Sequence, residues 1–529
     1  VRPLKKCDSP LRLDSLKVRR LRRVDHGQSA INRMCCCCNC SNTAKKVWTW
    51  VGVVGIFALA AFFGFGWPAI VNSVARSEFV MQPGSEVYEN WRKPEVPMYF
   101  DIYFWDWTNP EAITDPNVRP NFVQRGPYVF LETHDRANVN FNTDDTITFQ
   151  QKRTWHYIPE QSTGDFYTDR VTTPHTILMT VGKLVKEMND PMLTGLLDII
   201  INANNLVDGI AYPNVLVKDI LFDGVEDRLL AALQGLLAEV PDLAGEIELP
   251  DWDGFGYFIE RNTSVEYDGI FRMRTGTDSW TATGQMVTWN NAPTVPHYRG
   301  VCGQVRGSTG QVNPPMTSSQ INNPGDFILF ITDLCSALTL KYDGDFVLND
   351  LEGKVWVGDN RVFDNGHTFP ETECQCTAPV DQCPVLKPGM FDVSGCNFGA
   401  PLLVSFPHFY LADPSYLNRV SGLSPMRNAH EFRYALHPFS GIPMTVNGRL
   451  QYNVDVKDYG LAVTNGVPDV VMPAFWVEQR VVLTQDVIDD LVQIDTLRNA
   501  GIYTAYALLG VGVLAFAVAL YFTLAVWKD

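Results

Sequence analysis

The stretch VWTWVGVVGIFALAAFFGFGWPAIV, residues 47–71, contains no charged side chain. As an α-helix it would be about 37 Å long at ~1.5 Å per residue, longer than a hydrocarbon core of about 30 Å. A second uncharged run covers residues 501–527. Backbone groups in lipid must be satisfied within the segment, so both runs are expected to be helical. Two buried core helices are the alternative, but core helices of this length rarely lack a polar face. The chain is therefore predicted to be a membrane hairpin with its bulk between two spans.

The distribution of charge predicts the orientation. Residues 1–46 contain twelve Lys or Arg and three Asp or Glu, whereas residues 72–500 contain 29 basic and 55 acidic residues. Basic residues beside a span stay in the cytosol, so the tail 1–46 and the stub 528–529 are expected there. Residues 72–500 would then form an ectodomain, at the plasma membrane or in the lumen of a lysosome or endosome. The basic tail would contact anionic lipid, and its attachment to the membrane argues against a nucleic-acid partner.

The cysteines divide into two groups. Six lie in the predicted cytosolic tail, Cys7 and five just before the first span. These five are predicted sites of palmitoylation: Cys35, Cys36, Cys37, Cys38 and Cys40. Unmodified thiols or a metal site are the alternatives, but four adjacent cysteines cannot all face one tetrahedral ion. Six more lie between residues 302 and 396. An even number in an oxidising compartment predicts three disulfides, and spacing alone permits fifteen pairings.

The ectodomain is predicted to be one α+β body. Residues 98–107 and several runs up to residue 158 are rich in aromatic and β-branched residues, which favour an antiparallel meander. Residues 175–240 change to apolar spacings of three and four, which predict helices. Asp190 is expected to cap one of them, with Pro191 at its first position. From about residue 252 the sequence returns to strands and turns. No low-complexity linker divides residues 72–500, so a single large domain is expected.

No catalytic or cofactor motif emerges from the sequence. A Gly-x-Ser-x-Gly elbow is absent, and His430-Glu431 lacks a second histidine at the zinc-binding spacing because that position is Tyr434. We therefore expect no enzyme activity, no metal and no cofactor. Asn262, in Asn-Thr-Ser, is the one acceptor sequon of residues 72–500 and is predicted to be glycosylated.

Motifs spread over the whole ectodomain resemble the class B scavenger receptors, a family that includes the lysosomal integral membrane proteins and the insect sensory neuron membrane proteins. An insect-type member is expected. The segments that carry the resemblance are FDIYFWDWTNPEAI (100–113), RGPY (125–128), IPEQSTG (158–164), GSTG (307–310) with Pro314 and Pro315, GAPLLVSFPHFYLAD (399–413) and VMPAFWVE (471–478). GSTG departs from the family's Gly-Thr-Asp-Gly at Ser308 and Thr309.

This resemblance implies a fold and a function. It implies disulfides Cys302–Cys374, Cys335–Cys396 and Cys376–Cys383 within a stapled region, residues 302–396. It also implies a β-rich body with a helical cap and an internal apolar tunnel. The implied function is a receptor that captures sterols, carotenoids, fatty acids or lipoprotein lipids and passes them to the membrane. The alternative is an adhesion, phagocytic or cargo-sorting receptor that binds protein partners at the cap without lipid transport.

The cap would be the helical segment 175–240. Its candidate ligand-capture residues are Lys183, Lys186, Leu184, Leu196 and Ile200, although apolar stripes of this kind more often form plain core. Residues 175–250 contain four basic and twelve acidic residues. Because like charges raise the cost of approach, we expect neutral lipids to be preferred over anionic ones. Small residues in the spans are compatible with a homo-oligomer.

Overall fold

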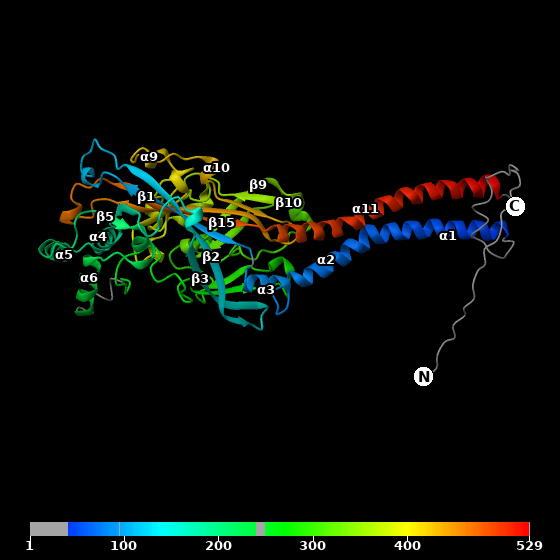
Figure 1. The fold of residues 1–529 in the computed structure, drawn as a ribbon, viewed down its shortest axis with the longest axis horizontal. Coiled ribbons are helices and arrows are strands. Elements are labelled where there is room, and N and C mark those ends of the chain that lie inside the picture. Colours follow the sequence, from blue (N-terminus) through cyan, green and yellow to red (C-terminus); the bar gives the residue numbers. More distant parts are fainter. Residues whose placement is uncertain (1–40, 95, 240–248, 528–529) are drawn as a thin grey trace, which may run out of the picture. The chain divides into compact units, whose positions relative to one another are not determined.

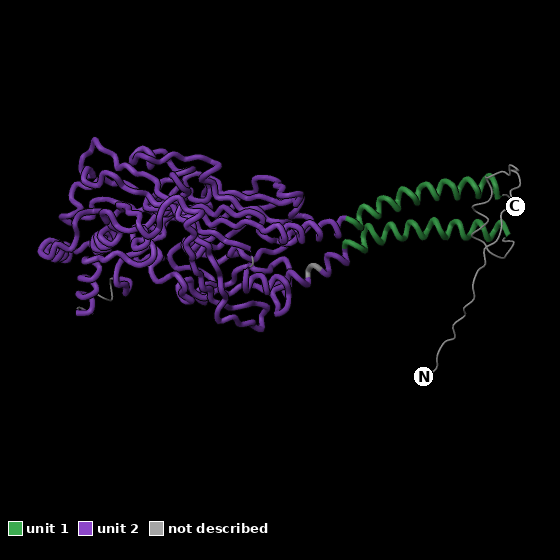
Figure 2. Tube along the Cα trace, viewed as in Figure 1, with its two compact units in different colours: residues 1–68, 500–529 green, residues 69–499 purple. Residues whose placement is uncertain are grey.

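The computed structural model describes residues 41–94, 96–239 and 249–527. The chain forms two compact units, one of residues 1–68 with 500–529 and the other of residues 69–499 (Figure 2). The predicted acylation sites lie outside the described residues.

The first unit contains two apolar helical segments. The N-terminal one consists of α1 (Asn42–Ala61), a π-helical turn (Phe62–Gly66) and the start of α2 (Trp67–Glu78). Pro68 has no N–H for the carbonyl four residues earlier, and the π-helical turn lies just before it, where Trp67 N–H bonds to the carbonyl of Phe62 instead. The C-terminal segment is the second half of α11 (Gln485–Tyr521) with a final turn (Phe522–Val526). Both are long and apolar enough to cross a membrane, as predicted.

Small residues bring the two segments of this unit together. A Cβ placed on Gly64 would lie 3.5 Å from the Cβ of Ala505, and one on Gly512 would contact Phe57. At the other end, Trp50 Nε1–H donates to Thr523 Oγ1 over 3.2 Å. The small residues therefore serve packing within one chain, and oligomerisation stays a prediction.

The second unit is built on one antiparallel sheet of 13 strands. Along its main path the order is β7-β6-β3-β2-β1-β15-β14-β13-β10-β9-β8, with β12 joined to β14 and β11 to β12. The strands of this sheet are β1 (Met98–Trp107), β2 (Phe122–Phe141), β3 (Thr146–Tyr157), β6 (Ile270–Arg274), β7 (Met286–Trp289), β8 (Phe327–Ile331), β9 (Ser336–Leu348), β10 (Leu351–Val357), β11 (Phe391–Asp392), β12 (Leu402–Ser405), β13 (Arg433–Leu436), β14 (Pro443–Val456) and β15 (Val470–Val482).

Aromatic side chains fill the core beside the central strands. The ring of Phe475 on β15 lies 5.8 Å from Phe104 on β1, 4.7 Å from Tyr257 and 4.8 Å from Tyr452 on β14. On β1 the residues that follow one another, Phe104 and Trp105, are both fully buried. Strand β1 is therefore covered on both faces, which explains why its sequence does not alternate between apolar and polar residues.

Helices occur at the ends of the sheet and between its strands. They are α3 (Glu86–Arg92), α4 (Thr176–Met188), α5 (Pro191–Ala203), α6 (Arg228–Glu239), α8 (Ser318–Asn322), α9 (Pro414–Leu417) and α10 (Arg427–His430). Three of them, α4, α5 and α6, fall in the segment predicted to be helical. The same segment also contains strand β5 (Ala211–Leu216), which pairs with β4 (Arg170–Pro174). Pro213 within β5 disfavours a helix there.

Helix α11 starts earlier than the predicted span. Its first turns, from Gln485, belong to the second unit, where Ile488 and Leu491 are buried in a small apolar cluster with Leu351 and Met444. Charged residues at positions 486, 489, 490, 495 and 498 interrupt the apolar pattern. The prediction from sequence therefore started the helical span at residue 501 and left this amphipathic part out.

A loop at this end of the unit contacts both chain segments that leave it. His437 Nε2 lies 3.1 Å from Asp495 Oδ2, and the Arg498 guanidinium lies 4.9 Å from the ring centre of Phe439. Phe439 also contacts Phe79 edge-on at 5.8 Å. The loop 437–441 is therefore shared by the segment that follows α2 and by α11.

Candidate functional site

Helices α4, α5 and α6 gather at one end of the second unit (Figure 1). Residues 485–499 lie at the opposite end of the same unit (Figures 1 and 2). We call the three helices the cap.

Specific residues set where the cap helices begin and end. His175 N-caps α4, with Nδ1 accepting a hydrogen bond from the backbone N–H of Leu178. Asn189 ends α4 in the left-handed conformation, and Asp190 immediately caps α5, whose first residue is Pro191. This is the capping arrangement that the sequence predicts. A break of two residues thus folds α5 back along α4.

One buried cluster holds the start of both α4 and α6. The His175 ring stacks on Tyr212 at 4.0 Å, and Tyr212 donates a hydrogen bond to Asp227. Asp227 also accepts the backbone N–H of Leu230 at the start of α6. Burial lowers the pKa of His175 and raises that of Tyr212. Both side chains therefore stay uncharged at neutral pH and fix the cap to the body.

The cap helices pack around a narrow apolar crevice whose open volume is only about 10 Å³. Its lining is aliphatic throughout: Val181, Leu184, Val185, Leu193, Leu197, Leu233, Leu236, Leu237 and Leu249. The outer face of α5 continues this apolar character into solvent, because Met192 is 83% exposed and Ile199 is 67% exposed. Exposed apolar side chains that lie together on one helix face indicate a surface that binds something.

The five predicted capture residues lie in different settings. Leu184 lines the crevice, Leu196 is exposed on α5 and Ile200 is half-buried. The two lysines are tethered: Lys183 Nζ donates to the carbonyl of Gly399 over 3.1 Å, and Lys186 Nζ donates to that of Asp458 over 3.0 Å. The structure therefore places only Leu184 at the crevice, while Leu196 is exposed to solvent and the lysines join α4 to neighbouring loops.

A polar cavity of about 170 Å³ lies on the other side of α4. Residues of α4, the stapled region and strands β12 and β14 surround it: Lys183, Asn365, Gln375, Cys376, Thr377, Ala378, Val385, Leu386, Asp392, Pro401, Leu403, Asp455 and Lys457. Except for Lys183, these polar residues were not singled out from the sequence. They come from five separated segments, and no local pattern joins them.

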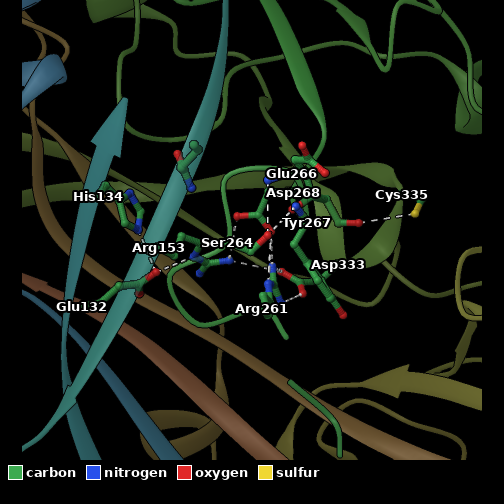
Figure 3. A network of polar contacts seen from close by, with 12 residues as sticks. Glu132, His134, Arg153, Arg261, Ser264, Glu266, Tyr267, Asp268, Asp333 and Cys335 are labelled. Carbon is green, nitrogen blue, oxygen red and sulfur yellow. Dashed lines mark hydrogen bonds and ion pairs between the residues drawn. The ribbon is translucent and has the colours of Figure 1, made fainter. Parts of the chain in front are cut away.

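Inside the sheet, a charged network surrounds Glu132 of β2 (Figure 3). Glu132 Oε1 lies 2.5 Å from Arg153 Nε and 2.7 Å from His134 Nε2. Burial alone would raise the pKa of Glu132, but Arg153 and His134 together bring it below its usual range. Burial lowers the pKa of His134, so its neutral ring donates to Glu132 through Nε2 and accepts from Gln311 through Nδ1.

The network continues to Arg261, which carries two carboxylates (Figure 3). Its guanidinium lies 2.8 Å from Asp268 and 2.5 Å from Asp333. Burial would lower the pKa of Arg261, but Asp268 and Asp333 raise it well above its ordinary value. Most of these groups pair with one another, so the network fastens β2, β3 and the 261–268 loop. The second oxygen of Glu132, Oε2, is buried without a hydrogen-bond partner.

Within the described part of the chain there are three disulfides, Cys302–Cys374, Cys335–Cys396 and Cys376–Cys383. These are the pairs that the family resemblance implies. Asn262 is exposed, and its Oδ1 accepts the backbone N–H of Trp155 over 3.1 Å. Its glycosylation stays a prediction.

A serine, a histidine and an aspartate come together in the loop 437–441. His437 Nδ1 lies 2.8 Å from Ser440 Oγ and its Nε2 faces Asp495. The His437 ring is 1% exposed and Ser440 is 5% exposed, and Ser440 Oγ also accepts the N–H of Ile442. The hydroxyl is thus held inside a turn and not presented to a substrate. Among the described residues, no group of three or more His, Cys, Asp or Glu side chains forms a metal site.

Comparison with known proteins gives consistent matches over most of the chain. The CD36 family model matches residues 50–523. The chain is 30% identical over 464 residues to Protein peste of Drosophila melanogaster, covering 87% of this chain and 80% of that protein. It is 28% identical over 477 residues to Scavenger receptor class B member 1 of Cricetulus griseus, with 89% and 88% covered. It is 25% identical over 488 residues to Sensory neuron membrane protein 2 of Ostrinia furnacalis, with 89% and 92% covered.

Proposed function

Because the chain belongs to the CD36 family of class B scavenger receptors, we propose that it is a membrane receptor that captures neutral lipids at its cap and passes them through the ectodomain to the bilayer. No chemical step is required, and the chain acts as a receptor and not as an enzyme.

The apolar surface of the cap is the observation that carries this proposal. Every lining residue is aliphatic, and the exposed face of α5 beside it offers Met192, Leu196 and Ile199 to an arriving particle. Each methylene that leaves water gains about 0.8 kcal/mol, so a lipid molecule would bind to such a surface without an energy source. The path onward to the bilayer is the internal tunnel that we propose from the family.

Charge supports neutral ligands over anionic ones. The segment 175–250 has three times as many acidic as basic residues. Lys183 and Lys186 are already bonded to Gly399 and Asp458. An anionic particle would therefore meet repulsion at the cap with few free cations to offset it.

Lipid uptake by cells that express the full-length chain tests the proposal. Labelled cholesterol or carotenoid should enter faster than labelled fatty acid. Leu236→Trp, which fills the crevice, should lower cholesterol uptake, whereas Val380→Trp at an exposed site outside the crevice should not. Uptake no higher than in cells without the chain would overturn the proposal, and faster fatty-acid uptake would overturn the neutral preference.

The exposed face of α5 also favours a second function, a docking receptor for protein partners without lipid transport. That function predicts partner binding that survives Leu236→Trp but is lost in Met192→Ser. The localisation, at the plasma membrane or in endolysosomal membranes, and the cytosolic placement of both termini belong to the same proposal.

A further inference from the structure

The polar cavity beside α4 is large enough for a small organic molecule. Its volume is about 170 Å³, and an engineered protein cavity of about 150 Å³ holds one benzene molecule. Thr377 and Val385 on its lining are exposed, so the cavity opens to the surface. A volume that little more than one ring fills has no room for the acyl chain of a lipid. The occupant that fits is therefore a soluble molecule of about the size of one ring.

Two carboxylates line the cavity, and only one of them is paired with a cation. Asp455 Oδ2 lies 2.6 Å from Lys457 Nζ. Asp392 accepts hydrogen bonds from Thr377 Oγ1 at 2.7 Å and from the backbone N–H of Ser394 at 2.9 Å. Both donors are uncharged, and within the described part of the chain Asp392 forms no ion pair. Its negative charge is therefore not compensated by the protein.

The lysine that α4 contributes to the cavity is already engaged elsewhere. Lys183 Nζ lies 3.2 Å from Glu187 Oε1 and donates to the carbonyl of Gly399 over 3.1 Å. Each of the two lysines on the lining therefore has an anion of its own. The charge left over in the cavity is that of Asp392, and it is negative.

The carboxyl group of Asp455 shows the same excess of negative charge. Burial raises its pKa, the adjacent Lys457 lowers it, and Asp469 and Asp392 raise it again. The pKa stays above its ordinary value although a cation lies next to the group. A second cation in the cavity would therefore be attracted by both carboxylates.

Much of the remaining wall is apolar. The apolar side chains on it are Ala378, Val385, Leu386, Pro401 and Leu403. An apolar lining with a few charged groups is typical of a small-molecule site. The ligand that matches this wall has a cationic group for the carboxylates and a compact apolar body for these side chains.

We propose that the cavity binds a small organic ammonium ion, a protonated amine whose apolar body is about one ring in size. The ammonium group contacts Asp392 and Asp455, and the body packs against Val385 and Leu403. This site goes beyond the proposed lipid function and needs no lipid. Because α4, the stapled region and β14 all contribute to its wall, an occupant would stabilise the attachment of the cap to the body.

Binding of benzylamine to the detergent-solubilised full-length chain at neutral pH tests the site. Benzyl alcohol is the matched neutral probe, and benzoate is the matched anion. In isothermal titration calorimetry, benzylamine should bind about tenfold more tightly than benzyl alcohol, the difference expected for one charge-assisted hydrogen bond. Benzoate should bind most weakly, because the carboxylates repel it. Benzylamine should also raise the midpoint of thermal unfolding.

Variants locate the binding site. Asp392→Asn should lower the affinity for benzylamine about tenfold and leave that for benzyl alcohol unchanged. Asp381→Asn, which changes an exposed carboxylate of the stapled region outside the cavity, should alter neither. Val385→Trp at the exposed mouth should weaken both probes, whereas Val380→Trp outside the cavity should weaken neither. Both valines are more than 60% exposed, so neither change disturbs the core.

Three results would overturn the proposal. They are the absence of saturable benzylamine binding to the wild type, equal affinities for benzylamine and benzyl alcohol, and benzylamine binding that survives both Asp392→Asn and Val385→Trp. Each of them would leave the proposed receptor function standing, because lipid uptake is measured separately. Lipid uptake that is absent while benzylamine binds as expected would overturn that function and leave the ammonium site standing.

Discussion

The sheet and the cap of the ectodomain differ in where they place side chains that are costly to accommodate: one buries charged groups and the other exposes apolar groups. In the sheet, the charges around Arg261 are buried and paired with one another. In the cap, apolar residues of α5 such as Met192 and Ile199 are left exposed although buried positions exist one turn away, at Leu197. Buried ion pairs of this kind cost stability when a partner is lost, whereas exposed apolar groups contribute little to folding. The comparison teaches that the sheet is built to hold its shape, and it supports the proposal that the cap binds a ligand.

The largest expected effect on stability comes from replacing Arg261. Arg261→Met should lower the free energy of unfolding by about 3–5 kcal/mol, because the buried Asp268 and the half-buried Asp333 would lose the cation that contacts both. Arg274→Met, which removes an exposed pair with Asp278, should cost at most about 1 kcal/mol. Thermal unfolding of the detergent-solubilised full-length chain measures both. Equal losses would mean that the buried network contributes no more to stability than an exposed ion pair.

The disulfides of the stapled region allow a comparison of a long-range link with a short-range one in their contribution to stability. Cys302–Cys374 closes a separation of 72 residues and Cys376–Cys383 one of 7. Replacing both cysteines of the long link by serine should cost about 4 kcal/mol, and of the short link about 2 kcal/mol, from unfolded-state entropy. Urea unfolding of the two double variants gives the difference. A larger loss for the short link would contradict this account.

Two stacked histidines should make the stability of the ectodomain depend on pH. The ring centres of His408 and His430 lie 3.9 Å apart. Burial, with a smaller contribution from His430, lowers the pKa of His408 to about 3. Burial, with a smaller contribution from Arg449, lowers the pKa of His430 to about 4. Below about pH 6.5 the unfolded chain binds protons that the folded chain does not, so stability falls as pH decreases towards 4. At pH 5 the loss should be about 2 kcal/mol for each histidine. Their Nδ1 atoms accept N–H groups of Ser424 and Met426, bonds that protonation there would break.

Unfolding measured from pH 7 to pH 4 tests this sign, and His430→Gln should remove about half of the slope. A stability that is independent of pH over this range, or that rises on acidification, would contradict the assignment of neutral rings to the folded state.

The smallest expected effect on stability is in the cap. Met192→Ser combined with Ile199→Ser should change the free energy of unfolding by about 0.5 kcal/mol or less per site and still lower cholesterol uptake. Leu197→Ala, on the buried side of the same helix, should cost about 2–5 kcal/mol. If the exposed pair proved as costly to stability as Leu197, the cap would be ordinary core.

Local patterns in the sequence predicted the parts of this fold that depend on local chemistry. The apolar runs gave the two candidate spans, and Asp190 with Pro191 marked the start of α5 as the structure has it. The charged network could not be predicted, because Glu132, Arg153, Arg261 and Asp333 meet through strand pairing between distant segments. The polar cavity was missed for the same reason: Asp392 on β11 and Lys457 just after β14 are far apart in the sequence and line one cavity only because β12 joins these strands.

The loop 437–441 has a mechanical consequence. It contacts Phe79, just after the first apolar segment, and Asp495 and Arg498, just before the second. A force applied to the ectodomain through either apolar segment would therefore act on the same loop. Pulling one segment away would have to break contacts that also hold the other. A receptor pulled by a bound particle gains resistance to shear from this arrangement without needing a larger base.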